Sequence, residues 1–197
     1  MHSFTRLASF FLFVLSLSFL ACAAPTPRSS ELAVRDYGYG NDSGSYSPAD
    51  NMKKILVDVT ADVHGNLELM LAATTIAQVE SQVDEIVVHI EHASDLVLAL
   101  GKLDLQAGVQ ADIAMQVYAL IKIIVRACAT VSLKFGITAV LALWAKIDAC
   151  VHLLLANLAV CVDGILALVL KLCVDVNVKL SIQAYLKLCA AALLGSA

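Results

Sequence analysis

The chain has little proline, few aromatic residues and little charge. Its three prolines all fall within the first 48 of 197 residues, so no proline interrupts a helix after that point. Aromatic residues make up 6% and charged residues 15%. Glycine-rich phosphate loops, nucleophile elbows and Cys-x-x-Cys pairs are all missing from the sequence. We therefore expect a non-enzymatic protein that uses no cofactor.

Nucleic acid is excluded as a partner because the net charge is −4 and no basic cluster occurs. The charge is nevertheless uneven. Residues 24–112 hold 14 acidic and 5 basic residues, whereas residues 113–197 hold 3 acidic and 7 basic ones. This asymmetry has two interpretations: an acidic first helix packs beside a weakly basic second half, or a basic, apolar second half meets anionic lipid.

The N-terminus has the pattern of a secretory signal peptide. Arg6 supplies positive charge, residues 10–20 form a short apolar core, and Ala21-Cys22-Ala23 matches the small-x-small rule for cleavage. We expect a signal peptide over 1–23 and a secreted, extracellular protein. A signal anchor, which would leave the protein membrane-associated, is the alternative.

Residues 24–51 have the composition of a disordered linker, with prolines, serines and a Tyr/Gly/Ser run. Asn41-Asp42-Ser43 is an N-glycosylation sequon, so we expect Asn41 to be a glycosylation site. A propeptide ending at Arg35 is a further alternative for the first part of this segment.

Residues 52–197 are predicted to form one all-α domain, because the chain is 60% hydrophobic, its mean hydropathy is +0.82, and alanine and leucine dominate this part. A heptad predicts a first helix over about 66–100, closed by Gly101. Its apolar positions are Leu69, Ala72, Ile76, Val79, Val83, Ile86, Ile90, Ala93, Val97 and Leu100.

Glycines then divide the chain at helical lengths and predict helices over about 103–135, 138–163 and 165–194. Short connections favour antiparallel neighbours, so the expected architecture is an up-and-down bundle of about four long helices. Alternating runs at 57–64 and 174–184 are typical of strands. The alanine content and the lack of internal turn residues favour helix there too.

The predicted third and fourth helices carry too few polar residues for an exposed surface. Between Ile147 and Leu172 the strongly polar residues are Asp148, His152, Asn157, Asp163 and Lys171. We therefore expect something else to cover this apolar surface: a second copy of the protein, a lipid or a bilayer. No uncharged run after the signal reaches 18 residues, so an ordinary membrane-spanning helix is weakly supported.

Five cysteines remain after the signal peptide, in a compartment where disulfides persist. An odd number leaves at least one thiol unpaired within the chain. Similar heights in parallel helices favour a Cys128–Cys189 bridge. The alternative is that several of the five are small buried hydrophobic residues.

Two groups of polar residues could carry chemistry. Glu85, His89 and His92 share a helix face with metal-ligand spacing, but a solvated face explains them better, and we predict no metal site. Asp148, His152 and Asp163 share another face, and a polar stripe explains these equally well.

The sequence ACAAPTPRSSELAVRD over 21–36 precedes a Tyr/Gly/Ser linker and a Val/Ala/Leu-rich domain with scattered cysteines. In this style the chain resembles small secreted hydrophobic proteins of mushroom-forming fungi, many of them uncharacterised. The resemblance implies secretion and no defined activity.

Two functions follow as hypotheses. The first is a secreted structural or interaction protein that forms homo-oligomers through apolar helix faces. The second is a membrane-active or lipid-binding protein that uses residues 113–197, with Lys122, Arg126 and Lys134 at the lipid.

Overall fold

The computed structural model describes residues 47–194, which form helices joined by short connections and contain no strand. The predicted all-α class is confirmed for this part of the chain. The predicted signal peptide, Asn41 and nearly all of the predicted linker lie outside the described residues. The helices are α2 (Pro48–Ala72), α3 (Ile76–Ala99), α4 (Ala107–Phe135), α5 (Ile137–Cys161), α6 (Ile165–Leu172), α7 (Val176–Tyr185) and α8 (Lys187–Leu194).

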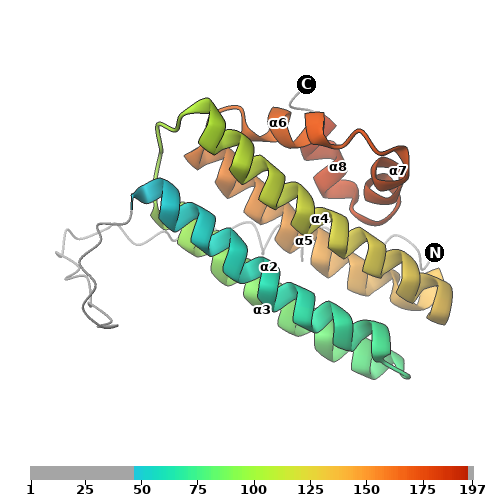
Figure 1. Cartoon of the computed structure of the whole chain (residues 1–197). Helices are drawn as coiled ribbons and strands as arrows, with labels where there is room; N and C mark the ends of the chain where they lie inside the picture. Colours follow the sequence, from blue (N-terminus) through green and yellow to red (C-terminus); the bar gives the residue numbers. More distant parts are fainter. Residues whose placement is uncertain (1–46, 195–197) are drawn as a thin grey trace, which may run out of the picture. The chain divides into compact units, whose positions relative to one another are not determined.

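The helices form three layers (Figure 1). One layer is the antiparallel hairpin of α2 and α3, the middle layer is the hairpin of α4 and α5, and the last consists of the short helices α6, α7 and α8. Helix α2 packs on α4, and α3 packs on α5. The short helices pack on the opposite side of the α4–α5 hairpin. The middle hairpin is therefore covered from both sides by the same chain.

Polar contacts fix the first two layers in a parallel register. Lys53 Nζ lies 2.7 Å from the Asp112 carboxylate near the beginnings of α2 and α4. At the far ends of the same helices, Lys134 Nζ donates to the carbonyl oxygen of Ala73 at 2.6 Å. On the other side, Asn157 Nδ2 of α5 donates to Ser94 Oγ of α3 at 2.8 Å.

The predicted first helix was wrong in one respect, because α2 and α3 are two helices and α2 begins at Pro48, inside the predicted linker. The helix is interrupted at residues 73–75. Thr75 Oγ1 accepts a hydrogen bond from Gln78 N at 3.3 Å, and Gln78 Oε1 accepts one from Thr75 N at 3.2 Å. This capping box starts a new helix inside the heptad pattern. The heptad positions before the box, and Ile76 just after it, are exposed, whereas those from Val79 to Val97 are buried.

The predicted fourth helix was also wrong, because residues 165–194 form three short helices. Asp175 caps α7 by accepting from Asn177 N at 2.9 Å, and α8 begins after Leu186. The breaks fold this segment back onto α4 and α5. The predicted count of four helices is thus replaced by seven in the part of the chain that the structure describes.

The second and third predicted helices match α4 and α5 closely, and Gly136 joins them with φ +85°. One face of α4 is buried from Ile113 to Val131. The only tryptophan, Trp144, is buried between the two helices and donates from Nε1 to Ser132 Oγ at 2.9 Å. Both alternating runs, at 57–64 and 174–184, lie chiefly in helices, as expected.

Candidate interaction surfaces

Glu85, His89 and His92 of α3 do not form a metal centre. His89 Nδ1 lies 3.6 Å from the Asp62 carboxylate of α2, while Glu85 and His92 are exposed on α3. Within residues 47–194 no group of three His, Cys, Asp or Glu side chains is placed to hold a metal ion.

The fold separates the polar residues of α5 from Asp163, which lies in the turn after this helix. Asp163 is exposed and forms an ion pair with Lys102 at 3.0 Å, whereas Asp148 is buried and His152 is half-buried. The structure therefore does not bring Asp148, His152 and Asp163 into one cluster.

Asp148 has a structural partner instead. Its carboxylate accepts from the backbone N–H of Leu188 at 2.7 Å and from that of Cys189 at 3.0 Å. These amides belong to the first turn of α8, where helix N–H groups have no partner within the helix. A carboxylate in this position also complements the positive end of the helix dipole. Asp148 therefore anchors α8 on α5.

All five described cysteines are buried free thiols, so the predicted Cys128–Cys189 bridge is not formed in the structure. Burial raises the pKa of the Cys150 thiol to about 12, with smaller contributions from Glu91 and Asp148. Burial also raises the pKa of Cys128 and of Cys189. Neutral thiols of this kind are poor nucleophiles. The cysteines therefore act as small apolar side chains of the core.

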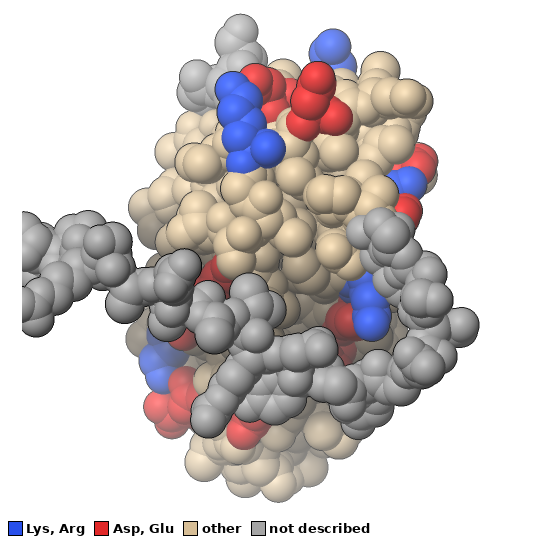
Figure 2. Space-filling view, turned by 90° about the vertical axis from the view of Figure 1, so that its left-hand side faces the viewer, with Lys and Arg blue, Asp and Glu red and all other residues tan. Residues whose placement is uncertain are grey.

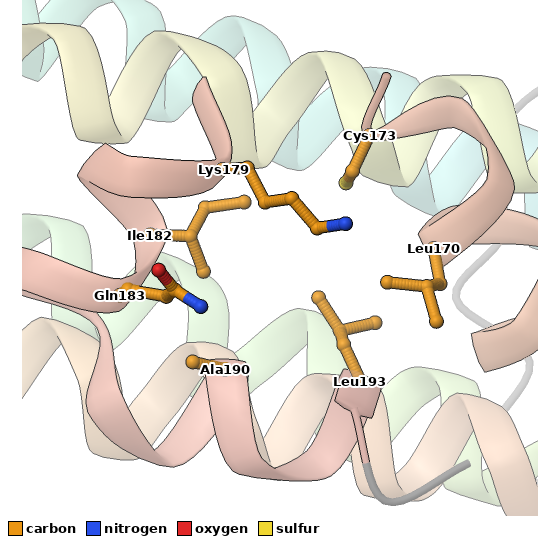
Figure 3. Close-up of a pocket in the computed structure, with 7 residues that line it drawn as sticks. All are labelled: Leu170, Cys173, Lys179, Ile182, Gln183, Ala190 and Leu193. Carbon is orange, nitrogen blue, oxygen red and sulfur yellow. The ribbon is translucent and has the colours of Figure 1, made fainter. Parts of the chain in front are cut away.

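A small cavity lies among the three short helices (Figure 3). It is lined mainly by apolar side chains, with Lys179 and Gln183 as the polar ones, and its free volume is about 20 Å³. A space of this size holds about one water molecule. It is a packing gap rather than a ligand site.

The three basic residues expected at a lipid surface all lie on α4 and differ in their contacts. The Lys122 ammonium lies 5.7 Å from the centre of the Tyr118 ring. Arg126 lines an open groove between α2 and α4, and Lys134 binds backbone carbonyls of the α2–α3 connection. At least Lys134 therefore has a structural role.

Exposed apolar side chains form two surfaces, besides others along the helices such as Val57, Met115 and Leu153. The first, here called the apolar end, is formed by the α2–α3 and α4–α5 turns, which Lys134 joins. Leu133 is 90% exposed there. The other large aliphatic residues exposed at this end are Leu69, Leu71, Ile76, Ile137 and Leu141.

The second exposed surface, here called the α7 stripe, is the solvent-facing side of α7. Val178 and Ile182 point into the protein, so Val176 and Leu180, which are 67% and 58% exposed, lie on the opposite side of the helix. Val174, just before α7, is also exposed. An outward apolar stripe on a short helix was missed because the sequence pattern was interpreted as one long helix.

Charge differs between the outer layers. Helix α3 has five acidic residues and no lysine or arginine, and all five are exposed. The segment 165–194 has three exposed lysines (Lys171, Lys179 and Lys187) and one acidic residue, the capping Asp175. Figure 2 shows the end where α2 and α4 begin, on which both signs of charge stand close together on a largely uncharged surface.

Helices α4 and α5 are long and apolar enough to cross a membrane by length and composition alone. Half of the residues in each apolar window are buried inside the protein, and the central helices of a folded domain meet the same criteria. No family model matches the chain, and comparison with curated proteins finds no match.

Proposed function

We propose that the protein is a secreted, non-enzymatic structural protein whose copies associate head to tail. In this assembly the α7 stripe of one copy packs on the acidic outer side of α3 of the next. The proposal is carried by one observation: one outer layer has an outward apolar helix and a net positive charge, and the other outer layer has an acidic face on α3.

The α7 stripe supplies the apolar part of the contact. Removing Val176 and Leu180 from water favours association by about 1.5–3 kcal/mol for each side chain that becomes fully buried. On α3, Val88 is 59% exposed in the middle of the acidic face and is the matching apolar residue.

Charge supplies the orientation. The outer layer that bears the stripe has the exposed lysines Lys171 and Lys187, and on α3 Glu91 and Asp95 lie about one and two turns beyond Val88 on the same side of the helix. Opposite charges across an interface select the partner surface and speed the encounter more than they add affinity. Because the two surfaces belong to different layers, one copy can bind two neighbours. Such heterologous contacts build rings or open filaments.

The non-enzymatic part of the proposal rests on the site chemistry described above. The cavity among α6, α7 and α8 admits about one water molecule, and the buried thiols are held in their neutral form. Neither feature supports a reaction.

A pair of substitutions on the stripe tests the proposal. In sedimentation velocity of the secreted protein, Val176→Gln with Leu180→Gln is expected to weaken self-association about 100-fold, since two apolar side chains lose their burial. The matched control is Val57→Gln with Met115→Gln, which alters residues that are 52% and 55% exposed between α2 and α4. The control is expected to associate like the unaltered protein.

A mixing experiment tests the head-to-tail geometry. Val88→Gln with Glu91→Lys removes the apolar contact and reverses one charge of the acidic face, so this variant alone should also associate weakly. Mixed with the stripe variant, it is expected to form dimers and nothing larger, because each protein retains one intact surface. Large oligomers from either variant alone would contradict the proposal.

A further inference from the structure

The apolar end lacks ionisable side chains in both of its turns. Residues 69–79 contain none, and neither do residues 135–145. The single charged group between the helix ends is Lys134, which ties the two turns together. This end of the domain therefore combines exposed aliphatic residues with a few uncharged polar ones and is almost free of charge, which is uncommon for a surface that faces water.

The backbone of the α2–α3 turn is already satisfied within the protein. Thr74 N donates to Gln78 Oε1 at 2.8 Å, and the capping box binds the amides of Thr75 and Gln78. Transfer of a backbone polar group out of water is costly unless it has an internal partner. This turn can therefore leave water without losing those hydrogen bonds.

Lys134 provides hydrogen bonds to the backbone carbonyls at the end of α2. Its ammonium donates to the carbonyl oxygens of Leu71 at 3.3 Å and Ala73 at 2.6 Å, groups that have no partner at a helix C-terminus. In the other turn, Gly136 N donates to the Ser132 carbonyl at 3.0 Å. The only cation at this end is thus bound to protein carbonyls.

The positions of the nearest acidic residues show how far the charge-free part of α2 and α3 extends from the apolar end. Glu68 precedes the end of α2 by four residues, and Glu80 follows the start of α3 by four. At 1.5 Å per residue the charge-free part of these helices is about 6 Å deep. Apolar faces of proteins bound at a membrane interface enter it by about 5–10 Å.

We propose that the apolar end seats in the interfacial region of a lipid bilayer, with Leu133, Ile137 and Leu141 in contact with acyl chains. This gives the lipid-binding hypothesis a defined surface, and it does not rest on the proposed self-association. The contact is apolar, so it requires no anionic headgroup.

Flotation with vesicles of phosphatidylcholine tests the proposal. The secreted protein is expected to float with the vesicles. Leu133→Gln with Ile137→Gln and Leu141→Gln is expected to bind about 100-fold more weakly, because three aliphatic contacts are lost without a change of charge. All three residues are exposed, so the fold is expected to survive, and circular dichroism checks this. Val57→Gln with Met115→Gln, which changes exposed residues outside the apolar end and outside the α7 stripe, is the control that should float normally.

A fluorescent label reports the depth directly. Because the five native thiols are buried, Leu133→Cys provides one reactive cysteine for an environment-sensitive dye. Its emission should shift to the blue on phosphatidylcholine vesicles, while the same dye at Met115→Cys, away from both proposed surfaces, should not shift. Equal flotation of the unaltered and triple-glutamine proteins would overturn the proposal. So would failure of the unaltered protein to float, or loss of self-association in place of flotation in the triple variant.

Discussion

Asp148 looks like part of a functional site in the sequence but has a structural role in the fold. On an apolar helix it stands out as a candidate for a charged cluster. In the structure its two oxygens meet two amides of α8, a helix that begins about 40 positions further along the chain. No local pattern encodes that distant contact, so its role could not be predicted from the sequence.

Removing this carboxylate should loosen α8. Asp148→Ala leaves two amides without their partner and is expected to lower the free energy of unfolding by about 2–4 kcal/mol. Asp148→Asn keeps one acceptor oxygen and should cost about 1 kcal/mol. Urea denaturation measures both, and an alanine variant as stable as the original protein would refute the anchoring role.

At the scale of the helices, the periodicity of the sequence predicted which faces are buried. It did not predict the helix boundaries, which depend on capping residues. The buried stripes of α3 and α4 follow the expected spacing because each packs one face against a neighbouring hairpin. The break before α3 lies inside the same heptad. The pair Thr75 and Gln78 was the available signal for it, since Ser/Thr followed three residues later by Glu/Gln starts a helix.

Glycines at two positions should respond in opposite directions. A methyl group added at Gly65 or at Gly136 meets no atom within 4 Å, so neither alanine variant causes a steric clash and the two can be compared. Gly65 lies within α2, and Gly65→Ala is expected to stabilise the protein by about 0.5–1 kcal/mol. Gly136 has φ +85°, and Gly136→Ala should cost about 1–3 kcal/mol in backbone strain. Thermal unfolding compares the two, and equal effects would argue against the strained turn.

At the scale of the whole domain, the layers explain a composition that otherwise suggests a membrane protein. Helix α5 has few polar residues because α3 covers one side and the short helices cover the other. The sequence indicated that its surface needed a cover but not that the chain supplies it. The apolar end and the α7 stripe remain exposed. We propose a lipid bilayer as the partner of the first and a second copy of the protein as the partner of the second.

Head-to-tail association is measured by sedimentation velocity of the secreted protein without detergent, at low and high salt. The protein is expected to stay in solution as oligomers and to shift toward smaller species as salt screens the lysine and carboxylate surfaces. A monomer at every concentration and salt would contradict head-to-tail association. Recovery only in detergent would contradict the finding that the chain covers its own apolar hairpin.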